Sequence, residues 1–173
     1  MTSGTTTTPP GDAPGATHSQ EAPVALKNRV VAHFLDGSVL KGTTQDFVPS
    51  RPHLHVVPMN GASGRRVLQT ELKALFFVKN LDGDPYRVDV PAFTGGPAEN
   101  AYGKKVAVRF PDGELICGYS LAYNTSKPGF FMATMAPRGN NERIYVLLSP
   151  GVTVTVGKEA EESLRAWSRD QAA

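Results

Sequence analysis

A nine-residue stretch occurs twice in this chain of 173 residues, at positions 34–42 and again at 110–118. Both copies keep a phenylalanine, an Asp-Gly pair and a second glycine five residues after the first. Asp-Gly between two apolar runs predicts a β-hairpin with a tight type I′ turn, because glycine accepts the positive φ that such a turn requires. The repeat therefore predicts two hairpins, turning at Asp36-Gly37 and at Asp112-Gly113.

Strand patterns flank each predicted turn. Apolar residues alternate with other residues over 29–34 and again over 105–110, the pattern of a strand with one buried face. A second strand follows each turn, over 38–47 and 114–123, and it is interrupted by Gly42 or Gly118. A glycine inside a strand usually marks a bulge or a bend. Such a bend would let a small sheet curl and close on itself.

The two copies match well beyond the turn. An aromatic residue stands at 47 and at 123, and a Pro-containing connection at 50–52 and at 126–128. A third strand and a Gly/Asn-rich turn follow, and then a fourth strand in which 66–68 matches 143–145. A correspondence of this length predicts an internal duplication. We therefore predict a mainly β protein with two tandem five-stranded small barrels, over 24–80 and 103–157.

The remaining segments have other compositions. Residues 1–23 hold no large apolar side chain after Met1, which predicts a disordered N-terminal tail. Residues 81–102 are rich in Gly, Pro and Asp and predict a linker. Residues 158–173 predict a short C-terminal helix whose apolar stripe of Ala160, Leu164 and Trp167 docks on a barrel.

Bulk composition excludes several protein classes. The 18 basic and 16 acidic residues leave a formal charge of +2, which is too small for a strong global field. A single cysteine excludes an intrachain disulfide framework. There is no run of 18 apolar residues, and the first residues lack the pattern of a signal peptide. We therefore expect a cytoplasmic protein with no membrane association.

Three histidines raise the question of a metal site. His53 and His55 lie two apart on one strand face, and His33 falls on a strand of the same predicted sheet. Three imidazoles could hold zinc or copper. However, only His33 has a polar counterpart in the second copy, Arg109, and no Cys, Asp or Glu stands beside them at a ligand-like spacing. We expect no metal.

Other reactive side chains have structural explanations. The aspartate of each Asp-Gly pair fits turn chemistry. Cys117 lies within a strand and has no motif that pairs it with a base, so it reads as a small buried residue. No nucleophile, base and oxyanion donor come together in the sequence. We predict a protein that is not an enzyme and that needs no cofactor.

The second copy carries the more promising surface. Phe130 and Phe131 are consecutive in a strand, so one of them should face away from its own barrel. An exposed aromatic residue with Met and Arg around it has the composition of a protein-binding hot spot. Alternatively, the linker, the other barrel or the final helix covers Phe131. The predicted binding residues are Lys127, Phe130, Phe131, Met132, Arg138, Asn140, Asn141 and Arg143.

The pattern of residues 34–47, with Asp36-Gly37, Leu40, Gly42 and Phe47, resembles the first motif of the Sm-like small barrel, and residues 110–123 repeat it. SH3-like barrels share this general shape. The Sm-like resemblance implies rings of subunits that pair their edge strands and bind RNA. Val48 and Asn124 stand where that family has a base-binding aspartate. The second copy is also similar to an uncharacterised bacterial domain appended to signalling and pilus or secretion proteins.

These observations favour a non-enzymatic interaction module. It would bind a protein partner, or associate with itself, through barrel edges and the Phe131/Arg143 surface. The alternative class is a protein that binds single-stranded RNA or DNA, which the family resemblance and a pI of about 8.7 favour. A third possibility is binding of an anionic nucleotide signal.

Overall fold

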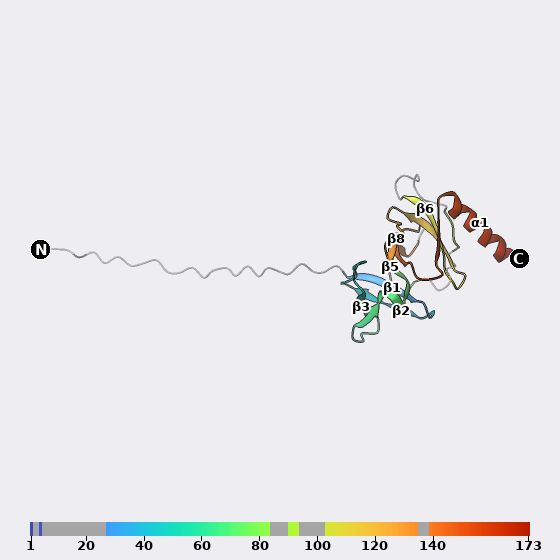
Figure 1. The fold of residues 1–173 in the computed structure, drawn as a ribbon. Helices are drawn as coiled ribbons and strands as arrows, with labels where there is room; N and C mark the ends of the chain where they lie inside the picture. Colours follow the sequence, from blue (N-terminus) through green and yellow to red (C-terminus); the bar gives the residue numbers. More distant parts are fainter. Residues whose placement is uncertain (2–3, 5–26, 84–89, 94–102, 135–138) are drawn as a thin grey trace.

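The computed structural model describes residues 27–83, 90–93, 103–134 and 139–173, together with Met1 and Gly4. Within those residues the chain forms ten strands, one 3-10 turn and one α-helix, which confirms the mainly β prediction. The predicted N-terminal tail and most of the predicted linker lie outside the described residues. In Figure 1 the strands from blue to green lie below those from yellow to orange.

We call the strands before the predicted linker the first half and those after it the second half. The first half contains β1 (Asn28–Phe34), β2 (Val39–Thr44), β3 (His53–Pro58), β4 (Arg65–Leu68), the 3-10 turn (Gln69–Glu71) and β5 (Leu72–Val78). The second half contains β6 (Lys104–Arg109), β7 (Leu115–Ser120), β8 (Gly129–Met132), β9 (Asn141–Leu147) and β10 (Thr153–Val156), followed by α1 (Lys158–Ala172).

The strands form two sheets, of which the larger runs through both halves and the smaller lies in the second half. The larger sheet has the order β4-β3-β2-β1-β5-β9-β8, and the smaller has the order β10-β6-β7. A bridge between Tyr119 and Ala133 joins β7 to β8, with both backbone hydrogen bonds 2.9 Å long. Each half therefore runs in the same order, from its fourth strand through its third, second and first to its fifth.

The strand registers of the two halves also agree. All six residue pairs of β1 and β2 recur in β6 and β7 with 76 added to each number, for example Val31↔Lys41 and Ala107↔Cys117. In the last strands the offset is 79, because Val30 pairs with Phe77 and Val106 with Val156.

The offset of 79 corrects the sequence match in the fourth strand. Leu54 pairs with Val67 and Phe130 pairs with Val146, so the counterpart of Val67 is Val146. The sequence match of 66–68 with 143–145 is therefore wrong by two residues. The second half has three more residues than the first between its third and fourth strands, in a Gly/Asn-rich part of the sequence that has no periodic pattern to align.

Both predicted hairpins are present, but the expected type I′ turn is wrong. The Gly37 N–H donates to the Phe34 carbonyl (3.1 Å) and the Phe34 N–H donates to the Ser38 carbonyl (2.9 Å), which encloses a three-residue loop. Gly37 has φ 84° and Gly113 has φ 88°, as expected for the glycine of a bulge that closes such a loop. The Asp36 carboxylate accepts the Ser38 N–H at 2.8 Å, so the aspartate stabilises the longer turn.

Gly42 and Gly118 allow two strands to approach closely. A Cβ atom at Gly42 would lie 2.2 Å from the Val57 carbonyl oxygen, and one at Gly118 would lie 2.3 Å from the Ala133 oxygen. Because a side chain cannot fit in either place, only glycine lets the second and third strands of each half pack at this point. The strand registers run through both glycines without a shift, so the expected bulge is absent, and the bend that would close the sheet stays a prediction.

Helix α1 covers the outer face of the second half. Ala160, Leu164 and Trp167 pack against Ala107 and the neighbouring apolar residues of β7, as the sequence predicted. Figure 1 shows α1 along the side of the second half that faces away from the first. In the described part of the chain, none of the helical structure is long and apolar enough to cross a membrane.

Candidate functional site

The two halves join along β5 and β9. These strands pair antiparallel through Ala74↔Val146, Leu75↔Tyr145, Phe76↔Ile144 and Phe77↔Arg143. Because side chains alternate along a strand, the pairing contributes to the cores on both sides. Leu75, Phe77, Tyr145 and Leu147 lie in the core of the first half, whereas Ala74, Ile144 and Val146 lie in the core of the second. We call this pairing the seam.

An aromatic cluster closes the seam on the side of the first half. The half-buried Phe131 lies 5.0 Å from Tyr145, 5.9 Å from Phe77 and 6.1 Å from Phe47, measured between ring centroids. Phe131 therefore leaves the core of its own half and packs against the other one. Of the alternatives that the sequence left open, the structure places Phe131 against the first half.

The other predicted binding residues are divided between core and surface. Phe130 and Met132 are each only 2% exposed, in the core of the second half. Arg143 is exposed, and its guanidinium lies 4.4 Å from the Phe77 ring centroid and 5.1 Å from that of Phe131. Such cation–π contacts hold the guanidinium over the aromatic cluster.

The two asparagines lie at one end of the seam. Asn140 accepts the Asn80 N–H at 3.0 Å and donates to the Asn80 carbonyl at 2.9 Å, and Asn141 pairs with Val78. Lys127 is exposed in the connection before β8, and Arg138 lies outside the described residues. The structure thus gathers Phe131, Asn140, Asn141 and Arg143 at the seam.

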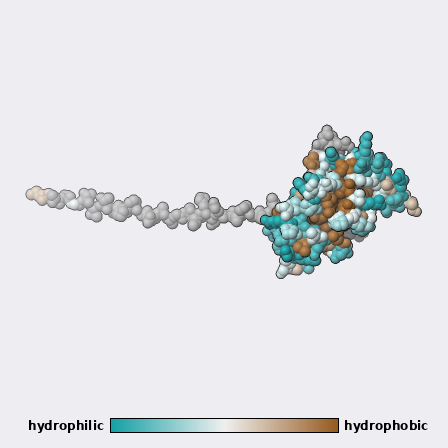
Figure 2. Space-filling model, viewed as in Figure 1, coloured by the Kyte–Doolittle hydropathy of each residue, from teal (hydrophilic) through white to brown (hydrophobic). Residues whose placement is uncertain are grey.

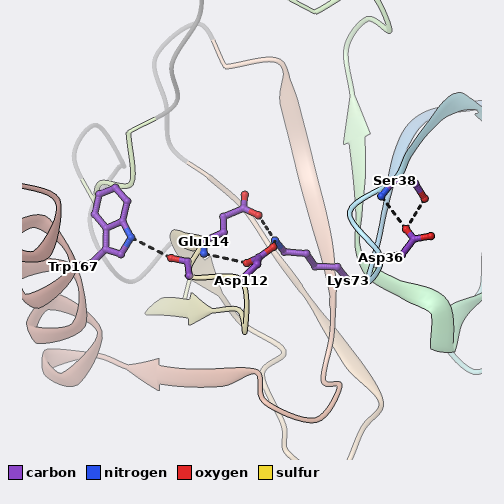
Figure 3. A network of polar contacts seen from close by, with 7 residues as sticks. Asp36, Ser38, Lys73, Asp112, Glu114 and Trp167 are labelled. Atoms are coloured by element: carbon purple, nitrogen blue, oxygen red, sulfur yellow. Dashed lines mark hydrogen bonds and ion pairs between the residues drawn. The ribbon is translucent and has the colours of Figure 1, made fainter.

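A buried lysine on the other side of the seam was missed by sequence reasoning. Lys73, on β5, is 7% exposed and donates hydrogen bonds to both Asp112 and Glu114 at the turn between β6 and β7 (Figure 3). Its ammonium also lies 4.5 Å from the centroid of the Phe110 ring. Lys73 therefore ties the first half to the hairpin of the second. The only sequence signal is Glu114, where the first copy has Ser38.

The charges of this network shift its pKa values. Burial acts to lower the pKa of Lys73, but its hydrogen bonds and attraction to Asp112 and Glu114 outweigh that effect and raise it. The hydrogen bond from Lys73 lowers the pKa of the Asp112 carboxyl. Both groups are consequently charged at neutral pH.

The candidate metal and thiol residues have structural partners. His33 packs 4.5 Å from Phe76 and burial lowers its pKa, while His55 contacts the Asp46 carboxylate at 2.7 Å. Among the residues with described positions, no three His, Cys, Asp or Glu side chains form a group that could hold a metal ion. Burial under α1 raises the pKa of the Cys117 thiol to about 12, so the predicted buried position of Cys117 is confirmed.

The surface over the seam is apolar. In Figure 2 hydrophobic side chains form a band down the middle of the face shown, over the region where β8, β5 and β1 are labelled in Figure 1. Hydrophilic side chains flank this band on both sides. The band and the paired strands beneath it are the features on which a binding function can be built.

The chain belongs to a family of unknown function, DUF6982, whose model matches residues 26–154. The match begins just before β1 and ends within β10, so it contains both halves and the seam between them. No curated protein matches the chain, and no solved structure matches it.

Truncating Phe131 tests whether the aromatic cluster holds the two halves together. Phe131→Ala should lower the free energy of unfolding by about 2 kcal/mol, because it removes most of a half-buried ring from the cluster. Urea denaturation would measure the change, with Lys127→Ala as the matched control at an exposed position nearby. Equal stability of the two variants would contradict the packing role.

Acid should weaken the Lys73 network. The pKa of Asp112 is lowered in the folded state, so its contribution to stability is present above the unfolded value of about 3.9. That contribution is lost as the pH falls through the folded value. Free energies of unfolding measured from pH 6 to pH 3 should therefore fall less steeply for Lys73→Met than for the wild type. A Lys127→Met control should retain the wild-type slope, and parallel curves for Lys73→Met would refute the coupling.

Proposed function

We propose that this chain is a non-enzymatic interaction module, built from two duplicated small barrels of the Sm- or SH3-like kind, which associates with further copies of itself through open sheet edges. The observation that carries the proposal is the seam, where β5 of one half pairs with β9 of the other. The chain thus already contains one edge-to-edge junction between its halves. Two sheet edges remain open in the described part of the fold, and their strands hold the same places in the two halves as the strands that pair in the seam.

The matching registers identify these edges. By their place in each half, β10 is the counterpart of β5, and β4 is the counterpart of β9. In the described strands β4 pairs only with β3, and β10 pairs only with β6. A second copy can therefore place its β4 beside β10 in the manner of the seam. Transferring the seam register predicts the pairs Thr153↔Val67, Val154↔Arg66 and Thr155↔Arg65.

The predicted contact is more polar than the seam. The seam buries Leu75, Tyr145 and Ile144, whereas two of the three predicted pairs would set a valine or a threonine beside an arginine. A contact that buries less apolar area is stabilised less by the hydrophobic effect, so two chains should associate more weakly than the two halves pair at the seam. Charged side chains on an edge strand also limit uncontrolled pairing. We therefore expect reversible association that increases with concentration.

A substitution can change the open edge of β10 and leave the hydrogen bonds between β10 and β6 intact. The Gly157 N–H donates to the Lys105 carbonyl, and alternate residues of a strand direct their backbone groups to the same side. The N–H of Val154 consequently points away from β6, toward the edge that a second copy would occupy. Proline is tolerated at such edge positions, where it removes one outward donor.

Val154→Pro and Val154→Ala form a matched pair for testing self-association. The wild type and Val154→Ala should both show a mass that rises with concentration in sedimentation velocity, whereas Val154→Pro should stay at the mass of one chain. A wild type that is monomeric over the whole concentration range would disprove association through copies of this chain. Equal association of the two variants would place the contact away from β10.

Binding of single-stranded nucleic acid is the second candidate, favoured by the charge of the first half. Residues 28–80 hold seven basic and three acidic side chains, although the whole chain is nearly neutral. Basic residues bind phosphates and release counterions, so such binding weakens steeply as salt rises. Fluorescence polarisation with a labelled single-stranded RNA should then show affinity that falls with added salt. Absence of binding at low salt would eliminate this candidate.

A further inference from the structure

We propose that the outer face of β1, β2 and β3 in the first half binds an amphipathic helix of a protein partner, with carboxylates flanking the apolar stripe of that helix. This face, which we call the open face, is distinct from the edges of β4 and β10 used for self-association. Its central residues are Val31, Val39, Lys41 and Val57.

The second half provides the template for this interaction. The counterparts of Val31, Val39 and Lys41 are Ala107, Leu115 and Cys117, because both hairpins have the same register. In the second half these three residues lie under α1 and are 1%, 4% and 4% exposed. In the second half a helix therefore covers this sheet surface, and the first half has a surface at the same strand positions.

The open face lacks such a cover in the described residues. Val39 is 51% exposed, whereas its counterpart Leu115 is 4% exposed, and Val57 on the neighbouring strand is 47% exposed. Val31, opposite Lys41 on β1, is half-buried. Thr43 pairs with Val57, which makes the surface continuous from β1 through β2 to β3. The three valines lie around Lys41, which pairs with Val31 and stands two residues from Val39 on β2, so the apolar positions are grouped around one cation.

The helix α1 of the same chain cannot provide this cover. It begins at Lys158, two residues after β10 ends at Val156, and it is held against Ala107 and Leu115 of the second half. Trp167 also donates to the Gly113 carbonyl at 3.3 Å, on the turn of that half (Figure 3). Among the described residues, α1 is therefore excluded as the occupant of the open face.

Charge indicates the kind of helix that fits. Two ion pairs fasten α1 on its own face, Glu161 with Lys105 at 2.6 Å and Asp170 with Arg109 at 3.5 Å. On the open face the counterpart of Lys105 is Arg29, and that of Arg109 is His33, which packs against Phe76. Lys41 adds an exposed cation where the second half has the neutral Cys117.

The outward positions of the three strands carry cations and neutral side chains, and the one carboxylate that the described part of the chain sets in contact with them, that of Asp46, pairs with His55. By alternation these positions are Arg29, Val31, His33, Val39, Lys41, Thr43, His53, His55 and Val57. A helix with acidic residues beside its apolar stripe is complementary to this surface.

A peptide with the sequence of residues 157–173 is a suitable probe, because it is an amphipathic helix with Glu161 and Asp170 in place. It would be titrated into the isotopically labelled full chain and followed by amide chemical shifts. Binding should shift the signals of Val31, Val39 and Lys41. Shifts confined to Ala107, Leu115 and Cys117 would mean that the peptide displaces α1, and that result would overturn the proposal.

Variants of the chain make the test specific. Val39→Asp should abolish binding of the peptide, while Leu121→Asp, which alters an exposed apolar residue of the second half, should leave it unchanged. Replacing Glu161 and Asp170 of the peptide by Gln and Asn should weaken binding by about two- to fivefold, as expected for exposed ion pairs. No shift at high peptide concentration, or equal binding by Val39→Asp, would also overturn the proposal.

Discussion

The pairing of β5 with β9 is the interaction on which the rest of the structure depends. One set of side chains on these strands, including Leu75 and Tyr145, fills the core of the first half, and the alternate set, including Ile144 and Val146, fills that of the second. Each half alone has about fifty residues and would bury little apolar surface. Sharing two strands gives both cores a common wall. It also removes two sheet edges that would otherwise be open to other chains.

The fold within each half could be predicted from the sequence because its signals are local. Turn glycines, period-two alternation and the helical stripe ending at Trp167 each act within a few residues, and the structure has the corresponding hairpins and helix. The seam could not be predicted, since it joins residues about seventy positions apart through no sequence motif. For the same reason the sequence leaves open what covers Phe131. It also does not reveal the ion pair of Lys73, because its partner Asp112 already has a role in the turn.

Equivalent positions in the two halves have different roles because they carry different side chains. Cys117 tolerates burial under α1 as a neutral side chain, whereas Lys41 at the same position stays in solvent. Ser38 bonds only within its turn, but Glu114 at the same position also reaches Lys73 across the molecule. The backbone registers are the same in both hairpins, so substitutions at the outward positions account for these differences. Backbone pairing sets the shape of each half, and the outward side chains decide what lies against it.

The contrast between the seam and the free edges bears directly on assembly. Joining two units in one chain gives their contact a high effective concentration, so the seam forms without a partner. A contact between separate chains has no such advantage and must also offset the entropy lost on association. The arginines of β4 and the threonines of β10 offer less apolar area than Leu75, Phe77 and Tyr145 do in the seam. The same strand geometry can therefore be permanent inside the chain and reversible between chains.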